Sequence, residues 1–463
     1  MADSPQSALV ALLDELRGRL PAAAILQGPA ASIAYGSDNS RLVGEPDLVL
    51  LPTRHEEVQA AVAACHRHGV PLTARGRGSN TTGACIAAEG GVVLGLERMQ
   101  RIIEIRPDDR VAVVEPGVLN GELQAALAPH GFFWAADPTS APYSSVGGNL
   151  ACNAGGPRTL KYGSARDNLM ALRAVDGQGR EFRCGAAVTK NSTGFDLTRL
   201  IAGSEGTLAI ITEATLRLTP LPEARRGMRA LYDSVDGAAA AVARVMAQPV
   251  VPSALEFMDD RALDLVRARG LELPKRARGL LLLEADGREA ALDDACAALG
   301  VAARGSGLVD WQVAGSTAEL ESLWAARKAL SPALRSLAPD KINEDVVVPV
   351  SRVPALLRRA QQLADEAGIP IVCFGHAGNG NLHVNLMFDR ADPAQARAAE
   401  RCLHTVFDSV LALGGTLSGE HGIGVAKRPF MARALDPVAL DLMRAIKRQF
   451  DPAGILNPGK LLP

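Results

Sequence analysis

Residues 75–83 read RGRGSNTTG and directly follow a short predicted strand at residues 71–74. The stretch combines three glycines, two arginines and four small hydroxyl or amide side chains. Such a loop can align backbone N–H groups and cationic side chains around a pyrophosphate. It is not a Walker loop, because the Gly-Lys-Ser/Thr ending is missing, and it is not a Rossmann GxGxxG turn. Taken alone, the motif fits a pyrophosphate loop and a flexible surface loop equally well.

A second loop-rich stretch, residues 137–156, reads DPTSAPYSSVGGNLACNAGG. Its Gly, Asn, Ser and Pro content excludes a long regular element, yet it lacks the charge of a disordered linker. A long ordered loop of this kind is usually functional. The strands predicted around the two loops cover residues 91–96, 101–105, 111–114, 172–175, 181–184 and 209–218.

A domain boundary is predicted at residues 220–222, which read PLP. Beyond it, strands alternate with alanine-rich helices. Strands are predicted at 228–232, 254–258, 279–285 and 341–349, and helices at 237–246, 261–269, 288–299, 320–337, 352–367 and 393–413. This pattern indicates an α+β segment in which a sheet carries helices on one face.

Two glycine-rich stretches, CFGHAGNGNLHVNL at 373–386 and LSGEHGIG at 417–424, concentrate candidate metal ligands. The imidazoles of His376 and His383 and the carboxylate of Glu420 form a ligand set for a divalent metal that leaves room for substrate. Strand alternation puts His383 and Asn385 on one face. A single histidine in a strand region is more often a packed core or turn residue. The clustering of these residues is what favours a metal site.

The composition excludes several other classes of protein. A chain of 463 residues is too long for one core, so two or three domains are expected. With 49 basic and 51 acidic residues and 4% aromatic residues, the chain offers no reason to expect nucleic acid as a partner. Neither a secretory signal nor a transmembrane segment is expected. The 7 cysteines lack a CxxC pair, which fits a cytoplasmic protein, with peripheral membrane association left open.

The order of the motifs resembles the vanillyl-alcohol oxidase and p-cresol methylhydroxylase type of flavoprotein. Within that type the chain is similar to the FAD-linked D-2-hydroxyacid dehydrogenases, which include D-lactate dehydrogenase, D-2-hydroxyglutarate dehydrogenase and the flavin subunit of glycolate oxidase. The resemblance covers nearly the whole chain. It is carried, in order, by RGRGSNTTG, DPTSAPYSSVGGNLACNAGG, KYG, GSEGTLAIIT, WAARK, GHAGNGNLH, SGEHGIG and NPGK.

The resemblance implies an α+β fold with three parts. Residues 1–220 would form a FAD-binding domain of two α/β subdomains. Residues 221–415 would form a cap domain on an antiparallel sheet, carrying the substrate and metal sites. Residues 416–463 would return to the FAD domain.

The same resemblance implies that FAD is held non-covalently, because the loops offer no histidine where covalent members attach the ring. The pyrophosphate loop would consist of Arg75, Gly76, Arg77, Gly78, Ser79, Asn80, Thr81 and Thr82. The flavin and its ribityl chain would lie against Pro138, Thr139, Gly147, Gly148, Asn149, Asn153, Ala154, Gly155 and Gly156. The adenine half or the isoalloxazine edge would be held by Glu205, Gly206 and Ile210, and Asn457 would reach the ring from the C-terminus.

The implied reaction is the oxidation of a D-2-hydroxy acid, such as D-lactate, to the 2-oxo acid with hydride transfer to flavin N5. Substrate oxygens would chelate the metal, which lowers the pKa of the hydroxyl. His421 would then take the hydroxyl proton as general base. The substrate contacts would be Arg327, Ser331, Lys341 and Asn385. An exchange of roles between Glu420 and His421 is left open.

The chain departs from the family pattern at a few positions. Asn379 stands where the metal loop usually carries Asp, and Arg77 and Asn80 stand where glycines are common. Lys341 is one residue out of step with the lysine that binds the distal carboxylate in the 2-hydroxyglutarate enzymes. D-2-Hydroxyglutarate and glycolate therefore remain alternative substrates.

Several further points stay open at this level. Zinc, manganese and iron all fit two imidazoles and a carboxylate. The sequence does not choose among a quinone, an electron-transfer flavoprotein and a cytochrome as electron acceptor, and it leaves a homodimer possible. Two other classes also remain: a non-redox metallohydrolase that uses the same ligand set, and a flavin electron-transfer module without substrate turnover.

Overall fold

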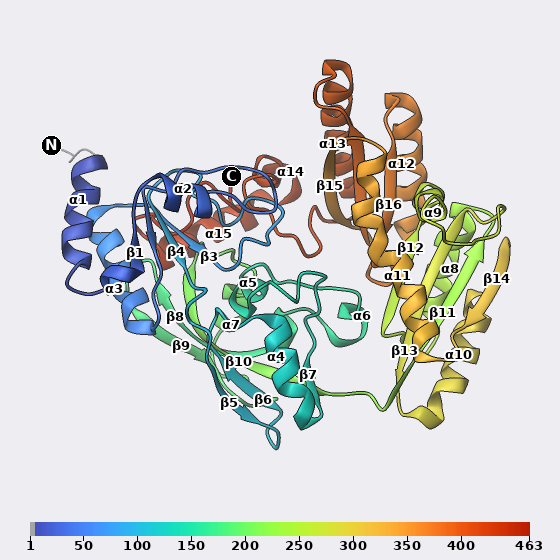
Figure 1. Ribbon diagram of the computed structural model, residues 1–463, viewed down its shortest axis with the longest axis horizontal. Coiled ribbons are helices and arrows are strands. Elements are labelled where there is room, and N and C mark those ends of the chain that lie inside the picture. Colours follow the sequence, from blue (N-terminus) through green and yellow to red (C-terminus); the bar gives the residue numbers. More distant parts are fainter. Residues whose placement is uncertain (1–4) are drawn as a thin grey trace. The chain divides into compact units, whose positions relative to one another are not determined.

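The computed structural model describes residues 5–463, which divide into two compact units (Figure 1). The first unit contains the chain up to Gly156, then Gly163–Leu221 and Glu420–Pro463. The second unit contains Pro157–Tyr162 and Pro222–Gly419. The six-residue insertion and the C-terminal return mean that the chain changes unit at several places. The two units are described separately below.

The first layer of the first unit is a four-stranded sheet in the order β1 (Ile25–Leu26), β2 (Leu48–Leu50), β4 (Val92–Gly95), β3 (Leu72–Arg75). The pairs β2–β4 and β3–β4 are parallel, and helix α3 (His55–His68) makes the crossover between β2 and β3. Apolar residues of these strands and of α3 form one core together with α1 (Pro5–Leu16). Strands buried on both faces explain the continuous apolar runs LVL and VVL.

The second layer of the first unit is an antiparallel sheet in the order β5 (Ile102–Arg106), β6 (Val111–Val114), β10 (Ala209–Pro220), β8 (Leu169–Asp176), β9 (Glu181–Gly185), with β7 (Phe132–Trp134) paired to the far end of β10. Its core contains the buried Trp134 and apolar residues of α4 (Asn120–Leu127), α5 (Val146–Ala151) and α7 (Leu197–Ile201). The C-terminal helices α14 (Met431–Ala434) and α15 (Pro437–Phe450) complete the unit.

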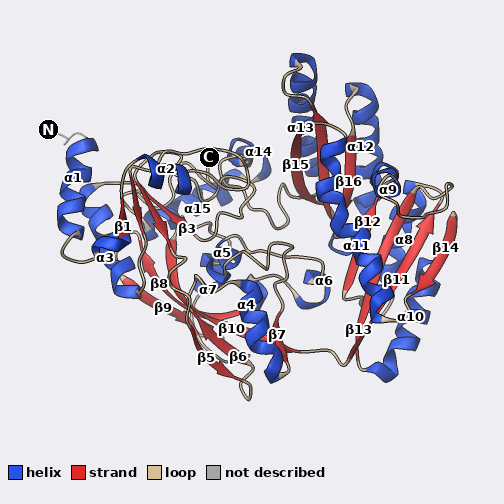
Figure 2. Ribbon diagram, viewed as in Figure 1, coloured by secondary structure: helices blue, strands red, loops and turns tan. Residues whose placement is uncertain are grey.

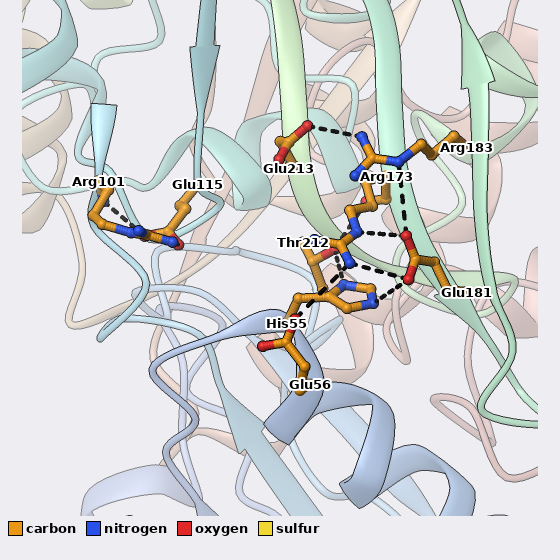
Figure 3. Close-up of polar contacts among 9 residues, drawn as sticks. All are labelled: His55, Glu56, Arg101, Glu115, Arg173, Glu181, Arg183, Thr212 and Glu213. Atoms are coloured by element: carbon orange, nitrogen blue, oxygen red, sulfur yellow. Dashed lines mark hydrogen bonds and ion pairs between the residues drawn. The ribbon is translucent and has the colours of Figure 1, made fainter. Parts of the chain in front are cut away.

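Polar contacts attach α3 to this second sheet (Figure 3). His55, at the start of α3, places Nδ1 2.8 Å from Oγ1 of Thr212, which lies at a β-bulge of strand β10. Arg173 donates from Nε to Glu181 of the neighbouring strand at 2.7 Å. The His55–Thr212 contact therefore bridges the two layers at a point where the sheet ladder is interrupted, and the Arg173–Glu181 ion pair joins two strands of the second sheet beside it.

The second unit is built on a seven-stranded antiparallel sheet (Figure 2). Its strands run in the order β14 (Leu308–Val313), β11 (Ala224–Tyr232), β13 (Gly279–Gly287), β12 (Ala254–Met258), β16 (Ile371–Gly375), β17 (Asn381–Phe388), β15 (Asp340–Val347). The antiparallel sheet expected for the cap is confirmed.

The expectation that helices cover one face of this sheet is wrong. Helices α9 (Asp260–Arg267) and α11 (Thr317–Ala333) pack on the face that carries Leu280 and Leu282. Leu281 and Leu283 point to the opposite face and are equally buried. Helices α8 (Val235–Ala247), α10 (Glu289–Ala303), α12 (Val353–Ala367) and α13 (Pro393–Ala412) account for the second covered face.

Within residues 5–463, none of the helices combines the length and the apolar content that a bilayer crossing requires.

Candidate functional site

The loop RGRGSNTTG leaves the C-terminal end of strand β3 and is stabilised by its own side chains. Asn80 accepts through Oδ1 from the backbone N–H groups of Thr82 and Ala84, both at 2.9 Å, which is the geometry of an Asx turn. The Arg75 guanidinium lies over the Tyr35 ring at 5.8 Å. The buried hydroxyl of Thr81 has no hydrogen-bond partner in the part of the chain that the structure describes.

The second loop, residues 137–156, contains one short helix, α5, whose N-cap is Ser145. Several glycines in this loop have no space for a side chain. A Cβ on Gly147 would lie 2.5 Å from Cβ of Pro116, and a Cβ on Gly156 would collide with the carbonyl oxygen of Asp137. Asn149 accepts from Asn120 Nδ2 at 2.9 Å. These contacts bring the loop backbone close to its neighbours, as glycine-rich cofactor loops require.

Three of the residues expected at the cofactor share an uncommon backbone conformation. Asn153, Glu205 and Asn457 have φ values of 51°, 52° and 46°. Non-glycine residues seldom adopt positive φ, and such strain clusters at functional sites. Asn457 Nδ2 donates to the carbonyl oxygens of Glu205 at 2.5 Å and Ala84 at 2.8 Å. The C-terminal tail therefore meets the loops that follow β3 and α7.

The remaining residues expected at the cofactor differ in burial and in backbone conformation. Ile210 points into the apolar core between α3 and the first sheet. Gly206 follows Glu205 with φ 70°, and the next residue, Thr207, is buried. In the second loop, Pro138 is half-buried and Thr139 is exposed.

The histidine site of the second unit lies on neighbouring antiparallel strands. His376 follows β16, His383 lies in β17, and their ring centroids are 5.3 Å apart at nearly a right angle. Ring nitrogens of the two histidines lie within 4.8 Å of each other. Both side chains are buried. Two imidazoles at this spacing match a pair of ligands to one metal ion.

Two buried carboxylates, which the sequence analysis missed, accompany the histidines. Glu256 of β12 hydrogen-bonds Nδ1 of His376, and Asp345 of β15 lies opposite His383 with an oxygen 3.9 Å from its Nδ1. A carboxylate on Nδ1 fixes the tautomer and leaves Nε2 as the metal-binding nitrogen. Burial raises the pKa of Glu256, but His376 and Arg327 outweigh it and lower the pKa to about 2.

The substrate residues expected in the second unit lie in different environments. Arg327 on α11 donates from Nε to Glu256 at 2.7 Å and lies over the Phe374 ring at 4.7 Å. Ser331, one turn further on, is exposed. Asn385 is fully buried, and its Nδ2 donates to the carbonyl oxygens of Val372 and His383. Lys341 lies at the start of β15.

The chain passes from the second unit to the first between Gly419 and Glu420. On the second-unit side, the Gly419 N–H donates to the Asp345 carboxylate at 2.9 Å. On the first-unit side, the His421 carbonyl accepts from Asn80 Nδ2 at 3.0 Å. Glu420 and His421 are thus the first two residues that the C-terminal segment contributes to the first unit.

The fold defines an architectural class: a domain of two mixed helix-and-sheet layers and a second domain built on an antiparallel sheet. The structure superposes on p-cresol methylhydroxylase with substrate bound (TM-score 0.81, 18% identity, covering 98% of this chain and 97% of that one). It also superposes on the 4-ethylphenol oxidase of Gulosibacter chungangensis in its isoeugenol complex (TM-score 0.76, 18% identity, covering 98% and 97%). At these identities the likeness concerns the fold.

The chain belongs to the FAD-linked oxidases. Residues 46–185 match the FAD binding domain family, and residues 221–461 match the family of the C-terminal domain of FAD linked oxidases. This membership confirms the expected resemblance, the fold class and the assignment to FAD-dependent oxidoreductases.

Relatives with related names align over nearly the whole chain. Glycolate oxidase subunit GlcD of Bacillus subtilis (strain 168) is 37% identical, covering 90% of this chain and 89% of the relative. A D-lactate dehydrogenase of Anaerostipes hadrus is 33% identical, covering 94% of each. A D-2-hydroxyglutarate dehydrogenase of Stutzerimonas stutzeri (strain A1501) is 32% identical, covering 97% and 98%.

The residues present fit FAD, which the family implies, and a divalent metal, which the ligand chemistry suggests. In the first unit, the glycines without side-chain space, the residues at positive φ and the orphaned Thr81 hydroxyl suit a large polyanionic cofactor that contacts backbone. In the second unit, paired imidazoles with a carboxylate on Nδ1 suit a divalent metal.

Proposed function

We propose that the protein oxidises a 2-hydroxy acid to the 2-oxo acid. The observation that carries this proposal is the pair of buried histidines, His376 and His383, with Glu256 fixing the tautomer of the first. The names of the relatives, which are glycolate oxidase, D-lactate dehydrogenase and D-2-hydroxyglutarate dehydrogenase, favour this substrate class. D-Lactate is the first candidate substrate.

Each candidate residue for metal and substrate binding has a defined part in this proposal. His376 and His383, with Glu420, hold the metal, while Glu256 and Asp345 orient the imidazoles. Arg327 grips the substrate carboxylate as a bidentate donor, and its contact with Glu256 keeps the guanidinium fixed. Ser331, Lys341 and Asn385 line the substrate side, with Lys341 suited to a second carboxylate.

His421 takes the proton of the substrate hydroxyl at a ring nitrogen. When bound, the metal supplies Lewis acidity toward that hydroxyl, and FAD supplies N5 as the acceptor of the C2 hydride. The residues proposed to bind the cofactor are 75–82, Pro138, Thr139, 147–149, 153–156, Glu205, Gly206, Ile210 and Asn457. We expect no covalent bond to the flavin.

A visible spectrum of the purified protein tests the proposal. Under anaerobic conditions, addition of D-lactate, D-2-hydroxyglutarate or glycolate should bleach the flavin band, and L-lactate should bleach it far more slowly. A flavin that none of these acids bleaches would indicate an electron-transfer module. Absence of a flavin band would leave the metallohydrolase alternative.

Chelation tests the metal separately. Dialysis against EDTA should abolish bleaching while leaving the flavin band, and zinc, manganese or iron should each be added back to identify the ion. Bleaching that survives removal of all divalent metal would refute the metal role. The acceptor follows from comparing a quinone, an electron-transfer flavoprotein and cytochrome c in turnover.

We place the protein in the reducing cytoplasm, because each of its seven cysteines is free in the part of the chain that the structure describes. Thiol titration of protein isolated under conditions that prevent oxidation would check this.

A further inference from the structure

The main chain around His421 is held by the loop that follows strand β3. The His421 carbonyl accepts from Asn80 Nδ2 at 3.0 Å and from the Thr82 hydroxyl at 3.3 Å. Further along, the N–H groups of Val425 and Ala426 both donate to the Thr82 carbonyl at 3.0 Å. Residues 421–426 are thus fixed at both ends, and a second contact fixes their middle.

That second contact is the buried carboxylate of Glu205. Its Oε1 accepts from the Ile423 N–H at 2.6 Å and its Oε2 from the Gly424 N–H at 2.8 Å. Gly422 packs so closely on this carboxylate that a Cβ there would lie 2.7 Å from Oε1. A carboxylate that accepts two backbone N–H groups makes charge-assisted hydrogen bonds, which are stronger than neutral ones.

Glu205 is itself held in place from the C-terminal tail. Its backbone has φ 52°, which a glutamate seldom adopts. Asn457 Nδ2 donates to the Glu205 carbonyl, and Asn457 Oδ1 accepts from Lys460 Nζ at 2.6 Å. Because the lysine can only donate, it fixes which end of the Asn457 amide faces Glu205. Lys460 is 4% exposed, so its charge is also placed deep within the first unit.

We propose that Glu205 is a positioning residue for His421, and that Asn457 and Lys460 hold Glu205 in the conformation this requires. The inference rests on the proposed function, in which His421 is the general base. Both carboxylate oxygens of Glu205 are engaged by residues 423–424, so its side chain acts on the His421 segment. Misplacing a reacting group by about 1 Å costs on the order of 10²-fold in rate.

The first test is amide hydrogen exchange on the FAD-loaded protein. Glu205→Gln keeps the shape of the side chain but turns one acceptor toward the segment into a donor. The amides of Ile423 and Gly424 should exchange about tenfold faster, equivalent to about 1.4 kcal/mol of local opening. Lys460→Met should act in the same direction with a smaller effect, since it reaches the segment only through Asn457 and Glu205.

Glu115→Gln is the matched control. Glu115 is also a buried glutamate of the first unit that accepts a backbone N–H, that of Arg101 at 2.8 Å, as well as its guanidinium (Figure 3). Its substitution should lower the melting temperature without changing exchange at Ile423 and Gly424.

Kinetics provide the functional measurement. Glu205→Gln should lower kcat at least tenfold with little change in KM. A merely structural role would lower the melting temperature without this separation of kcat from KM.

The outcomes separate this inference from the proposed function. Unchanged exchange at residues 423–424 in Glu205→Gln would overturn the inference, as would equal acceleration in the Glu115→Gln control. A wild-type protein that oxidises no 2-hydroxy acid would refute the proposed function, and the exchange measurement would still decide whether Glu205 anchors the His421 segment.

Discussion

The two units hold their candidate chemistry in different ways. In the first, the candidate cofactor residues lie in loops whose shape depends on glycines and on Asn153, Glu205 and Asn457 at positive φ. In the second, His376 and His383 lie on or beside regular strands and are oriented by buried carboxylates. The first region should therefore be sensitive to atoms added next to its backbone, and the second to the removal of side-chain atoms.

The largest effect should come from removing a histidine of the second unit. His383→Ala should lower turnover of the 2-hydroxy acid about 10³-fold, because the proposed metal would lose a ligand and with it several kcal/mol of charge stabilisation. Metal content measured by mass spectrometry should fall, while the flavin band should persist. His130→Ala, at an exposed position of the first unit, should leave metal and turnover unchanged. Full activity in His383→Ala would show that the proposed metal site takes no part in the reaction.

The next effect concerns the buried carboxylate behind His376. Glu256→Gln should lower the free energy of unfolding by about 3–5 kcal/mol, since it leaves the Arg327 charge without its ion-pair partner. It should also weaken metal binding about 10–100-fold. Urea unfolding and metal titration measure the two quantities. Glu289→Gln, whose carboxylate is exposed, should change neither by a measurable amount.

The same carboxylate gives a pH signature. Its pKa is lowered from 4.5 to about 2, so the stabilisation that it contributes is complete above pH 4.5 and is lost as pH falls toward 2. Wild-type protein should therefore lose stability more steeply than Glu256→Gln below pH 4.5. Parallel curves for the two proteins would contradict this account.

The sequence shows the glycine loops and the histidine motifs because their signals are local. Glu256 and Asp345 were missed because each meets its histidine only through sheet pairing, and Glu256 lies 120 positions before His376. Their signal was an acidic residue inside an apolar strand, as in ALEFM and NEDVV. The wrong placement of helices on one face had a readable sign too, since LLLL in β13 is the pattern of a strand buried on both faces.

The burial of Lys460 was not predicted from the NPGK motif, because a lysine ordinarily lies in solvent. Its burial follows from the return of the tail to strand β3, where Asn457 N donates to the Leu72 carbonyl at 2.7 Å. That contact joins residues far apart in the sequence, and no local pattern announces it.

A smaller effect is expected from adding one methyl group to the loops of the first unit. Gly156→Ala should lower the free energy of unfolding by about 1–3 kcal/mol, because the new Cβ would collide with the Asp137 carbonyl oxygen. It should also lower the FAD content of the purified protein. Gly18→Ala is the matched control, since no heavy atom of the described chain lies within 4 Å of a Cβ there. Flavin content and melting temperature are the measurements. Equal flavin content in both variants would show that the loop tolerates the change, and the contrast between the units would weaken.

The smallest effect should come from the polar contacts between α3 and the second sheet of the first unit (Figure 3). Burial lowers the pKa of His55 below its usual 6.5 and the Arg173 charge adds to this, while Glu181 and Glu56 oppose it. A histidine with a lowered folded-state pKa binds protons more readily when unfolded, so stability is complete above pH 6.5 and declines as pH falls below it. His55→Gln should remove part of this decline, by about 1 kcal/mol or less, with turnover at pH 7.5 unchanged. These contacts lie at a bulge of regular strands and not in the glycine loops, so the FAD content should not change. A large loss of FAD in His55→Gln would show that the cofactor loops depend on this sheet as strongly as on their own backbone.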